Sequence, residues 1–191
     1  MDRYSDEFSK VSGNFSKAWA LQKGPCPSVD FVFAVTNNTL EQKWRAYGRN
    51  VQVKDVEELY HGTMLACNIT ATRTLCNKGN CGICGISSAG LDTRCISKDS
   101  FQRFGSGFYL APNSSKCSDY THGCHGYKAM LTCDVLPGKK YTLQTNRRQL
   151  SGPPSGYDSV HGKVGGDLNY PELVVYNPDA VLPRYIIVYR H

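Results

Sequence analysis

The spacing of short apolar runs in the last two thirds of the chain constrains the fold most strongly. Runs such as Tyr127–Leu136 and Leu168–Tyr176 are rich in strand-forming residues and are separated by Gly and Pro. Helical patterning is concentrated in the first third, where Leu40, Trp44 and Tyr47 share one face of a predicted helix. Because strands follow one another without alternating helices, the pattern predicts an α+β domain.

We expect one domain and no internal repeat. The 191 residues, 40% of them hydrophobic, are enough to form one buried core. Residues 1–24 are polar and weakly patterned, so we expect a flexible N-terminal lead-in, with a short helix around "FSKAWAL", before a single domain over residues 25–191. The net charge of +6 favours the approach of a phosphate-bearing ligand but does not establish nucleic-acid binding.

The first residues of the chain and its cysteines indicate the cellular compartment in which we expect the protein. The first residues, "MDRYSDEFSK", are polar, and no apolar run is long enough to span a membrane. We therefore expect no signal peptide, no membrane association, a cytoplasmic or nuclear location, and a monomer. In such a reducing compartment, nine cysteines are expected to be free thiols or metal ligands rather than disulfides.

A cysteine-rich stretch, "CNITATRTLCNKGNCGIC", contains a C-x4-C-x2-C core with metal-ligand spacing. Its four candidate ligands are Cys67, Cys76, Cys81 and Cys84. A structural zinc is the leading interpretation, and free buried thiols and disulfides are the alternatives. Further candidate ligands are Cys95, His122, Cys124 and His125.

Glu172 is a charged residue inside the strand-like run "LNYPELVVY". Side chains alternate along a strand, so Glu172 shares its face with Tyr170 and Val174. A carboxylate among apolar neighbours must find partners or shift its pKa. Taken alone, the stretch favours a surface glutamate on an edge strand, because Pro171 cannot donate a hydrogen bond to a neighbouring strand.

Five ordered motifs over the chain from about Val29 to the C-terminus resemble the catalytic domain of the poly(ADP-ribose) polymerase family. These are diphtheria-toxin-like ADP-ribosyltransferases with a His–Tyr–Glu triad, and the likeness is greatest to short, stand-alone fungal-type members. The motifs are "VDFVFAVTNNTLEQKW", "HGT", "RFGSGFYLA" with "SSK" and a Tyr, "GYDSV", and "LNYPELVVY" with "PRYIIVY". The resemblance implies two packed, mostly antiparallel β-sheets with flanking helices in the N-terminal third.

The resemblance also implies the roles of individual residues. It makes His61, Tyr109 and Glu172 the catalytic set, with Glu172 stabilising positive charge that develops on the ribose of NAD. In NAD binding, His61 holds the adenosine ribose, and Tyr109 stacks on the nicotinamide. The implied NAD-binding residues also include the backbone clamp, the second stacking ring and their neighbours: Gly62, Thr63, Ser115, Cys117 and Tyr120.

The chain departs from the family pattern at one implied contact. Cys117 stands where the family usually has a serine that donates a hydrogen bond to the nicotinamide carbonyl, and a thiol is a weaker donor. The stretch "ISKDSFQRFGSG" before Tyr109 corresponds to the family's loop over the donor.

The function implied is NAD-dependent transfer of ADP-ribose, as single units, to a macromolecular acceptor. NAD is then a substrate, and the reaction needs no metal. Chain elongation to a polymer is one alternative, and NAD hydrolysis with water as acceptor is another. A non-catalytic NAD- or ADP-ribose-binding module is a third, against which the intact triad argues. The loop over residues 146–166 is expected to contact the acceptor, but its residues do not identify that acceptor as protein or nucleic acid.

Overall fold

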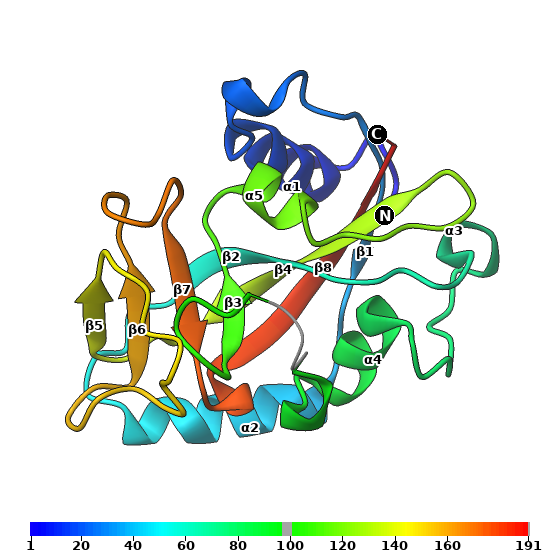
Figure 1. Cartoon of the computed structure of the whole chain (residues 1–191). Coiled ribbons are helices and arrows are strands. Elements are labelled where there is room, and N and C mark those ends of the chain that lie inside the picture. Colours follow the sequence, from blue (N-terminus) through cyan, green and yellow to red (C-terminus); the bar gives the residue numbers. More distant parts are fainter. Residues whose placement is uncertain (97–100, 191) are drawn as a thin grey trace.

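Two four-stranded β-sheets pack against each other in the computed structural model, which describes residues 1–96 and 101–190 (Figure 1). The first sheet has the order β1 (Val29–Ala34), β8 (Val181–Tyr189), β4 (Lys128–Val135) and β2 (Glu57–Gly62). The second has the order β3 (Phe108–Leu110), β7 (Glu172–Val175), β6 (Ser159–Gly162) and β5 (Lys140–Leu143). Strands β5 and β6 are parallel, and every other named pair is antiparallel. This confirms the predicted α+β fold.

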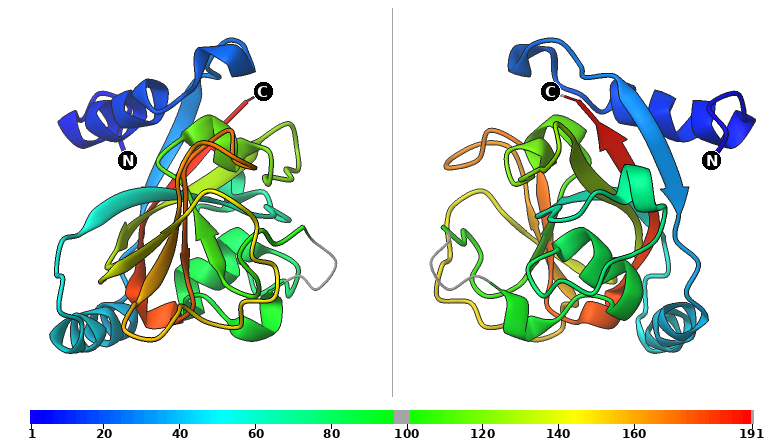
Figure 2. Two further views of the ribbon diagram at one scale, coloured as in Figure 1. Left: turned by 60° about the vertical axis from the view of Figure 1, so that its left-hand side comes forward. Right: turned by 90° about the vertical axis from the view of Figure 1, so that its right-hand side faces the viewer.

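Helices cover the ends and one side of the sheets. The α-helices are α1 (Asp6–Lys17), α2 (Asn38–Asn50), α3 (Ile69–Thr72), α4 (Gly82–Ala89) and α5 (Ser114–Ser118). The 3-10 helices in the described part of the chain are η1 (Leu21–Lys23), η2 (Thr93–Cys95) and η3 (Pro178–Ala180). Figures 1 and 2 show α1 and α2 at opposite ends of the molecule, with α1 near both chain termini.

The main hydrophobic core lies between the two sheets. Leu131 and Val135 of β4 contribute to it from the first sheet, and Leu173 and Val175 of β7 contribute from the second. Val174 belongs to a separate cluster on the other face of β7. This is the alternation predicted for the strand that contains Glu172.

Strand β8 lies between β1 and β4 although it contains a proline. Pro183 pairs with Cys133 at an irregularity in the β4–β8 register, between Thr132 and Cys133. A proline has no N–H for the ladder, so it is tolerated in an internal strand where the pairing is already interrupted.

The N-terminal segment differs from the flexible lead-in expected for residues 1–24. Helix α1 begins after Ser5, whose hydroxyl accepts a hydrogen bond from the Phe8 amide. Phe8, Val11 and Phe15 form its buried face and pack on the first sheet together with Trp19. The segment is polar by count, but its apolar residues have helical spacing, and that spacing builds a second core cluster.

Helix α2 is capped by the side chain of Asn37 and continues past Gly48 to Asn50. One local expectation is also corrected, because the loop expected over residues 146–166 contains strand β6, which pairs with both β5 and β7. Its sequence, "SVHG", is too short for a periodic signal, so only its neighbours in the sheet make it a strand.

No helix among residues 1–96 and 101–190 is long and apolar enough to cross a membrane.

Phe15→Ala tests whether α1 is part of the folded domain. Phe15 is fully buried, and its ring centroid lies 5.3 Å from that of Tyr189. Removing such a side chain leaves a cavity, so we expect a loss of about 3–5 kcal/mol in the free energy of unfolding. Urea denaturation measures it, with Tyr4→Ala as control because Tyr4 is 95% exposed. A change in Phe15→Ala as small as in the control would mean that α1 is not part of the core.

Candidate functional site

Glu172 is a buried carboxylate on an internal strand. It begins β7, which lies between β3 and β6, and only 4% of the residue is exposed. It therefore does not sit on an edge strand facing solvent, the interpretation favoured by its local sequence alone. Gly162 pairs with it on β6, and a Cβ at Gly162 would lie 2.5 Å from Leu168 Cδ2, 2.6 Å from Phe104 Cε2 and 3.1 Å from Glu172 Cγ. The missing side chain at Gly162 therefore leaves room for all three of these side chains.

Two cations flank this carboxylate. Lys116 Nζ lies 3.5 Å from Glu172 Oε2, and Arg103 Nε lies 4.0 Å from Oε1. Among the described residues, Oε1 is buried and accepts no hydrogen bond. Burial raises the pKa of Glu172, and the charges of Lys116 and Arg103 offset that effect only in part. One carboxylate oxygen is thus buried without a hydrogen-bond donor among the described residues, which is typical of a functional site rather than of a contact that serves stability.

Lys116 connects Glu172 with Tyr120. It lies on α5, its ammonium donates to the Tyr120 hydroxyl at 3.3 Å, and it lies 5.2 Å from the Tyr120 ring centroid. Burial lowers the pKa of Lys116, but Tyr120 and Glu172 together raise it by more, so the net direction is upward. The side chain is therefore a positive charge shared between the carboxylate and the aromatic ring.

His61 is oriented by the backbone of β3. Its Nδ1 lies 2.9 Å from the carbonyl oxygen of Tyr109. Since a carbonyl only accepts, Nδ1 carries the proton in this contact. Burial lowers the pKa of His61 and favours the neutral imidazole. Neutral His61 then presents Nε2 as an acceptor for a hydroxyl group.

The Tyr109 hydroxyl holds the preceding segment in place. It donates to the carbonyl of Gly105 and accepts from the amide of Phe104, both at 2.9 Å. On β7 its register partner is Val174, two residues after Glu172. The strand pairing therefore fixes the distance between these two predicted triad members along the sheet.

Gly62 lies against the C-terminal end of α5. A Cβ on Gly62 would lie 2.0 Å from the Cys117 carbonyl oxygen and 3.3 Å from the Tyr120 Cβ atom. A close approach of this kind excludes any side chain at position 62. Tyr120 itself is 54% exposed, so its ring is accessible beside Gly62.

The side chains of Ser115 and Cys117, which the resemblance assigns to NAD binding, form hydrogen bonds within the chain. The Ser115 hydroxyl accepts a hydrogen bond from the Ala20 amide at 3.1 Å. The buried Cys117 thiol donates to the Tyr60 carbonyl at 3.1 Å. Both contacts join α5 to its surroundings, and the nicotinamide contact that the resemblance gives to Cys117 stays a prediction.

The structure thus brings the predicted triad and its neighbours together from both sheets. His61 and Gly62 end β2, and Thr63 follows it. Tyr109 lies on β3 and Glu172 on β7. An antiparallel bridge between Tyr60 and Ala111 joins β2 to the chain after β3, and so connects the two sheets at this site. Part of the expected donor loop, residues 97–100, lies outside the described residues.

Three residues at Glu172 were not predicted. Arg103 and Lys116 form ion pairs with the carboxylate, Gly162 makes room for the Glu172 side chain, and only the tertiary structure brings them there. Lys116 belongs to the "SSK" motif, but its partner lies 56 positions away in the sequence. A buried acid requires cations nearby, so the sequence predicts that such partners exist without identifying them.

The four cysteines of the predicted metal site form one cluster. The Sγ atoms of Cys67, Cys76, Cys81 and Cys84 all lie within 4.8 Å of one another. The Cys67 sulfur lies 3.6 Å from that of Cys84 and 3.9 Å from that of Cys81. A tetrahedral zinc with Zn–S bonds of about 2.3 Å requires S···S separations of about 3.8 Å. The separations fit zinc, and they are too long for disulfide bonds.

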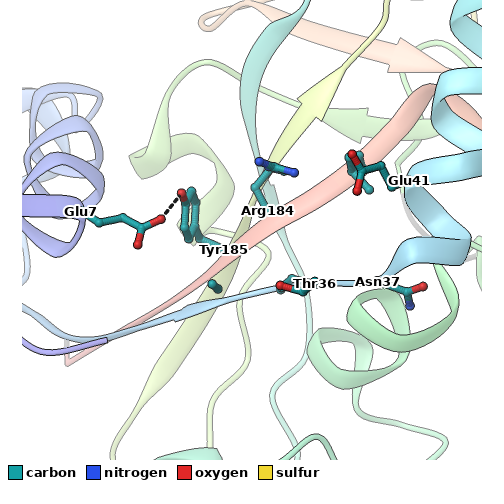
Figure 3. A pocket seen from close by; sticks show the side chains of 9 residues that line it. Glu7, Thr36, Asn37, Glu41, Arg184 and Tyr185 are labelled. Atoms are coloured by element: carbon teal, nitrogen blue, oxygen red, sulfur yellow. Dashed lines mark hydrogen bonds between the residues drawn. The ribbon is translucent and has the colours of Figure 1, made fainter.

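A pocket elsewhere on the molecule is lined by neither the predicted triad nor the four cysteines. Figure 3 shows it between α1, β1, β8 and the start of α2, lined by residues that include Thr36, Asn37 and Arg184. The Tyr185 hydroxyl there donates to Glu7 at 2.6 Å, which joins α1 to β8. The pocket contains no residue of the predicted triad.

Comparisons with known proteins identify the family to which the chain is similar. Residues 5–165 match the family model of the poly(ADP-ribose) polymerase catalytic domain. Human protein mono-ADP-ribosyltransferase PARP4 is 34% identical over 104 residues, which cover 51% of this chain and 6% of that protein. Human protein mono-ADP-ribosyltransferase PARP3 is 26% identical over 139 residues, which cover 71% of this chain and 22% of that protein. The poly [ADP-ribose] polymerase tankyrase of Caenorhabditis elegans is 27% identical over 125 residues, or 46% of this chain and 6% of that protein.

The family match covers most of the chain, whereas the matched segment is less than a quarter of each of these three relatives. It includes His61 and Tyr109 and ends before Glu172, whose place comes from the β3–β7 and β6–β7 pairings. With the two-sheet fold and the matched family model, the chain belongs to the poly(ADP-ribose) polymerase catalytic-domain family.

Proposed function

We propose that the protein cleaves the nicotinamide–ribose bond of NAD and transfers ADP-ribose, as single units, to a macromolecular acceptor. The observation that carries the proposal is the buried carboxylate of Glu172, which keeps one oxygen without a hydrogen-bond partner among the described residues. The residues of this site are those expected from the family resemblance: His61, Gly62, Tyr109, Tyr120 and Glu172.

Glu172 would act on the charge that develops during bond cleavage. As the C–N bond breaks, the electron pair leaves with nicotinamide and the ribose carbon becomes positive. A fixed carboxylate stabilises this charge more than it stabilises the neutral ribose, and this lowers the barrier. The acceptor hydroxyl or amine then forms the new bond to that carbon, and its proton passes to the carboxylate or to solvent.

The ring of Tyr109 and the exposed ring of Tyr120 would stack on nicotinamide. Neutral His61 would accept a hydrogen bond from a ribose hydroxyl through Nε2, since its Nδ1 donates to the Tyr109 carbonyl. Lys116 would hold Glu172 and Tyr120 in one arrangement through its contacts with both. These contacts position the donor before any acceptor arrives.

Single-unit transfer is supported by the similarity to PARP4 and PARP3, both of which are named protein mono-ADP-ribosyltransferases. The main alternative is NAD hydrolysis, in which water takes the place of the acceptor. Incubation with NAD labelled in the adenylate part separates the two, because transfer leaves the label on a macromolecule and hydrolysis leaves free ADP-ribose. Nicotinamide release without any bound label, across protein and nucleic-acid acceptors, would contradict transfer.

We further propose that Cys67, Cys76, Cys81 and Cys84 hold one structural zinc. Backbone amides donate to the sulfurs: Ala66 N lies 3.3 Å from Cys81 Sγ, and the amide of Lys78 bonds to Cys76. Such N–H···S contacts stabilise thiolates, the form that binds zinc. No step of the proposed reaction passes through this metal.

Glu172→Gln should abolish turnover and leave NAD binding intact. The amide keeps the size of the side chain and removes its charge, so kcat for nicotinamide release should fall on the order of 100-fold or more. Because burial raises the folded-state pKa of Glu172, its ionisation costs stability as pH rises above the ordinary carboxyl pKa. The melting temperature at pH 7 should therefore be equal to or above that of wild type. Turnover within a few-fold of wild type would exclude the catalytic role.

Lys116→Met should shift the acidic side of the pH–rate profile upward. The ammonium lowers the pKa of Glu172 against the larger effect of burial, so its removal raises that pKa further. More of the protein then carries protonated, inactive Glu172, and kcat should fall more at pH 6 than at pH 8. Lys43→Met, on the exposed side of α2, is the control. A parallel loss at both pH values would show that Lys116 acts only through substrate binding or packing.

The zinc proposal predicts about one equivalent of zinc per chain in the protein as purified. Cys76→Ser should lose the metal and lower the melting temperature, whereas Cys26→Ser, at an exposed thiol outside the cluster, should change neither. Elemental analysis and thermal unfolding measure the two effects. A metal-free wild-type protein with freely titrating thiols would leave the buried-thiol alternative.

A further inference from the structure

The four-cysteine cluster lies next to the chain segment that continues from His61, Gly62 and Thr63. Directly after these residues, the Met64 carbonyl accepts from the Ile83 amide at 3.1 Å, and Ile83 lies on α4 between two of the cysteines. The next residues lead to Cys67, and Ala66 donates to the Cys81 sulfur at 3.3 Å. The end of β2 is thereby connected to the cluster within five residues.

The segment that follows Tyr120 is connected to the same cluster. The Leu65 amide donates to the His122 carbonyl at 2.7 Å. The Cys124 thiol donates to the Cys67 carbonyl at 3.1 Å. Predicted nicotinamide contacts lie on two segments, one ending in Thr63 and one in Tyr120. The residues that follow each segment are therefore hydrogen-bonded to the cysteine cluster or its neighbours.

Gly82 lies tightly against Thr63, one of the predicted NAD-binding residues. It is the first residue of α4 and stands between Cys81 and Cys84 in the sequence. A Cβ on Gly82 would lie 2.1 Å from Thr63 Oγ1, 3.0 Å from its Cγ2 and 3.1 Å from its Cβ atom. Rotation of the Thr63 side chain moves Oγ1 and Cγ2 but not Cβ, so a side chain at position 82 turns the Thr63 side chain and shifts the residue by a few tenths of an ångström.

We infer that the zinc site positions the NAD site, with the Gly82–Thr63 contact as the connection. The inference rests on the proposed function and on the proposed zinc. Helix α4 has eight residues, too few to be stable alone in water. Zinc bonds to four cysteines fix α4 against the segment from Cys67 to Cys76. The start of α4 then fixes Thr63, and with it the backbone of Gly62.

Two glycine substitutions on the same helix test the connection and leave all four thiols in place. Gly82→Ala displaces Thr63, whereas Gly85→Ala is the matched control because, apart from its chain neighbours and the backbone of its own helix, nothing lies within 4 Å of a Cβ at Gly85. Both are made in the Glu172→Gln protein, so that calorimetry measures NAD affinity without turnover. We expect both variants to keep about one zinc, and only Gly82→Ala to bind NAD roughly fivefold or more weakly.

A second measurement uses the unsubstituted protein, in case Gly82→Ala impairs folding. Zinc removal by a chelator should weaken NAD binding, and added zinc should restore it. Equal NAD affinity of the two glycine variants, with zinc retained in both, overturns the inference, as does unchanged affinity after zinc removal. A failure of the proposed function appears differently, as wild-type protein that releases no nicotinamide from NAD.

Discussion

The burial of the Glu172 carboxylate is the interaction on which the arrangement of the site depends. A charge without hydration is costly unless cations and hydrogen-bond donors surround it. Here Arg103 comes from the segment before β3 and Lys116 from the segment after it. Gly162 has no side chain, and this leaves space for the side chain of Glu172. The remaining cost appears as a raised pKa, which is typical of a carboxylate placed for chemistry rather than for stability.

The two sheets hold this carboxylate at a fixed distance from its partners. Strand pairing sets Tyr109 opposite Val174 and Gly162 opposite Glu172. Tyr109 and Glu172 therefore cannot move along the sheet unless the backbone hydrogen bonds of β3–β7 or β6–β7 break. The Tyr60–Ala111 bridge then places the end of β2 beside β3. Backbone hydrogen bonds therefore do much of the positioning, and the side chains need only short, local contacts.

The parts of the chain outside the sheets support the same site from two directions. Helix α1 packs on the first sheet, and Ser114 on α5 donates to the Phe15 carbonyl at 2.8 Å, which connects the N-terminal helix with the helix that carries Lys116. On the other side, the cysteine cluster is joined to the end of β2 and to the chain after Tyr120. The N-terminal segment, polar by composition, thus acts as part of the domain.

The sequence by itself determined the α+β class and the strands within Tyr127–Leu136 and Leu168–Tyr176, because strand alternation is a local property. The two-sheet arrangement and the interest of His61, Tyr109 and Glu172 followed from the resemblance to a family, which rests on short motifs that are also local. The sequence also indicated the four cysteines by their spacing. It did not reveal the packing of α1, the strand β6, or the partners Arg103 and Lys116. Those depend on contacts between residues far apart in the chain, where no local pattern identifies the neighbour. Whether Glu172 faced solvent or the interior was decided only by the tertiary structure, because a strand's own sequence does not say what packs on either side of it.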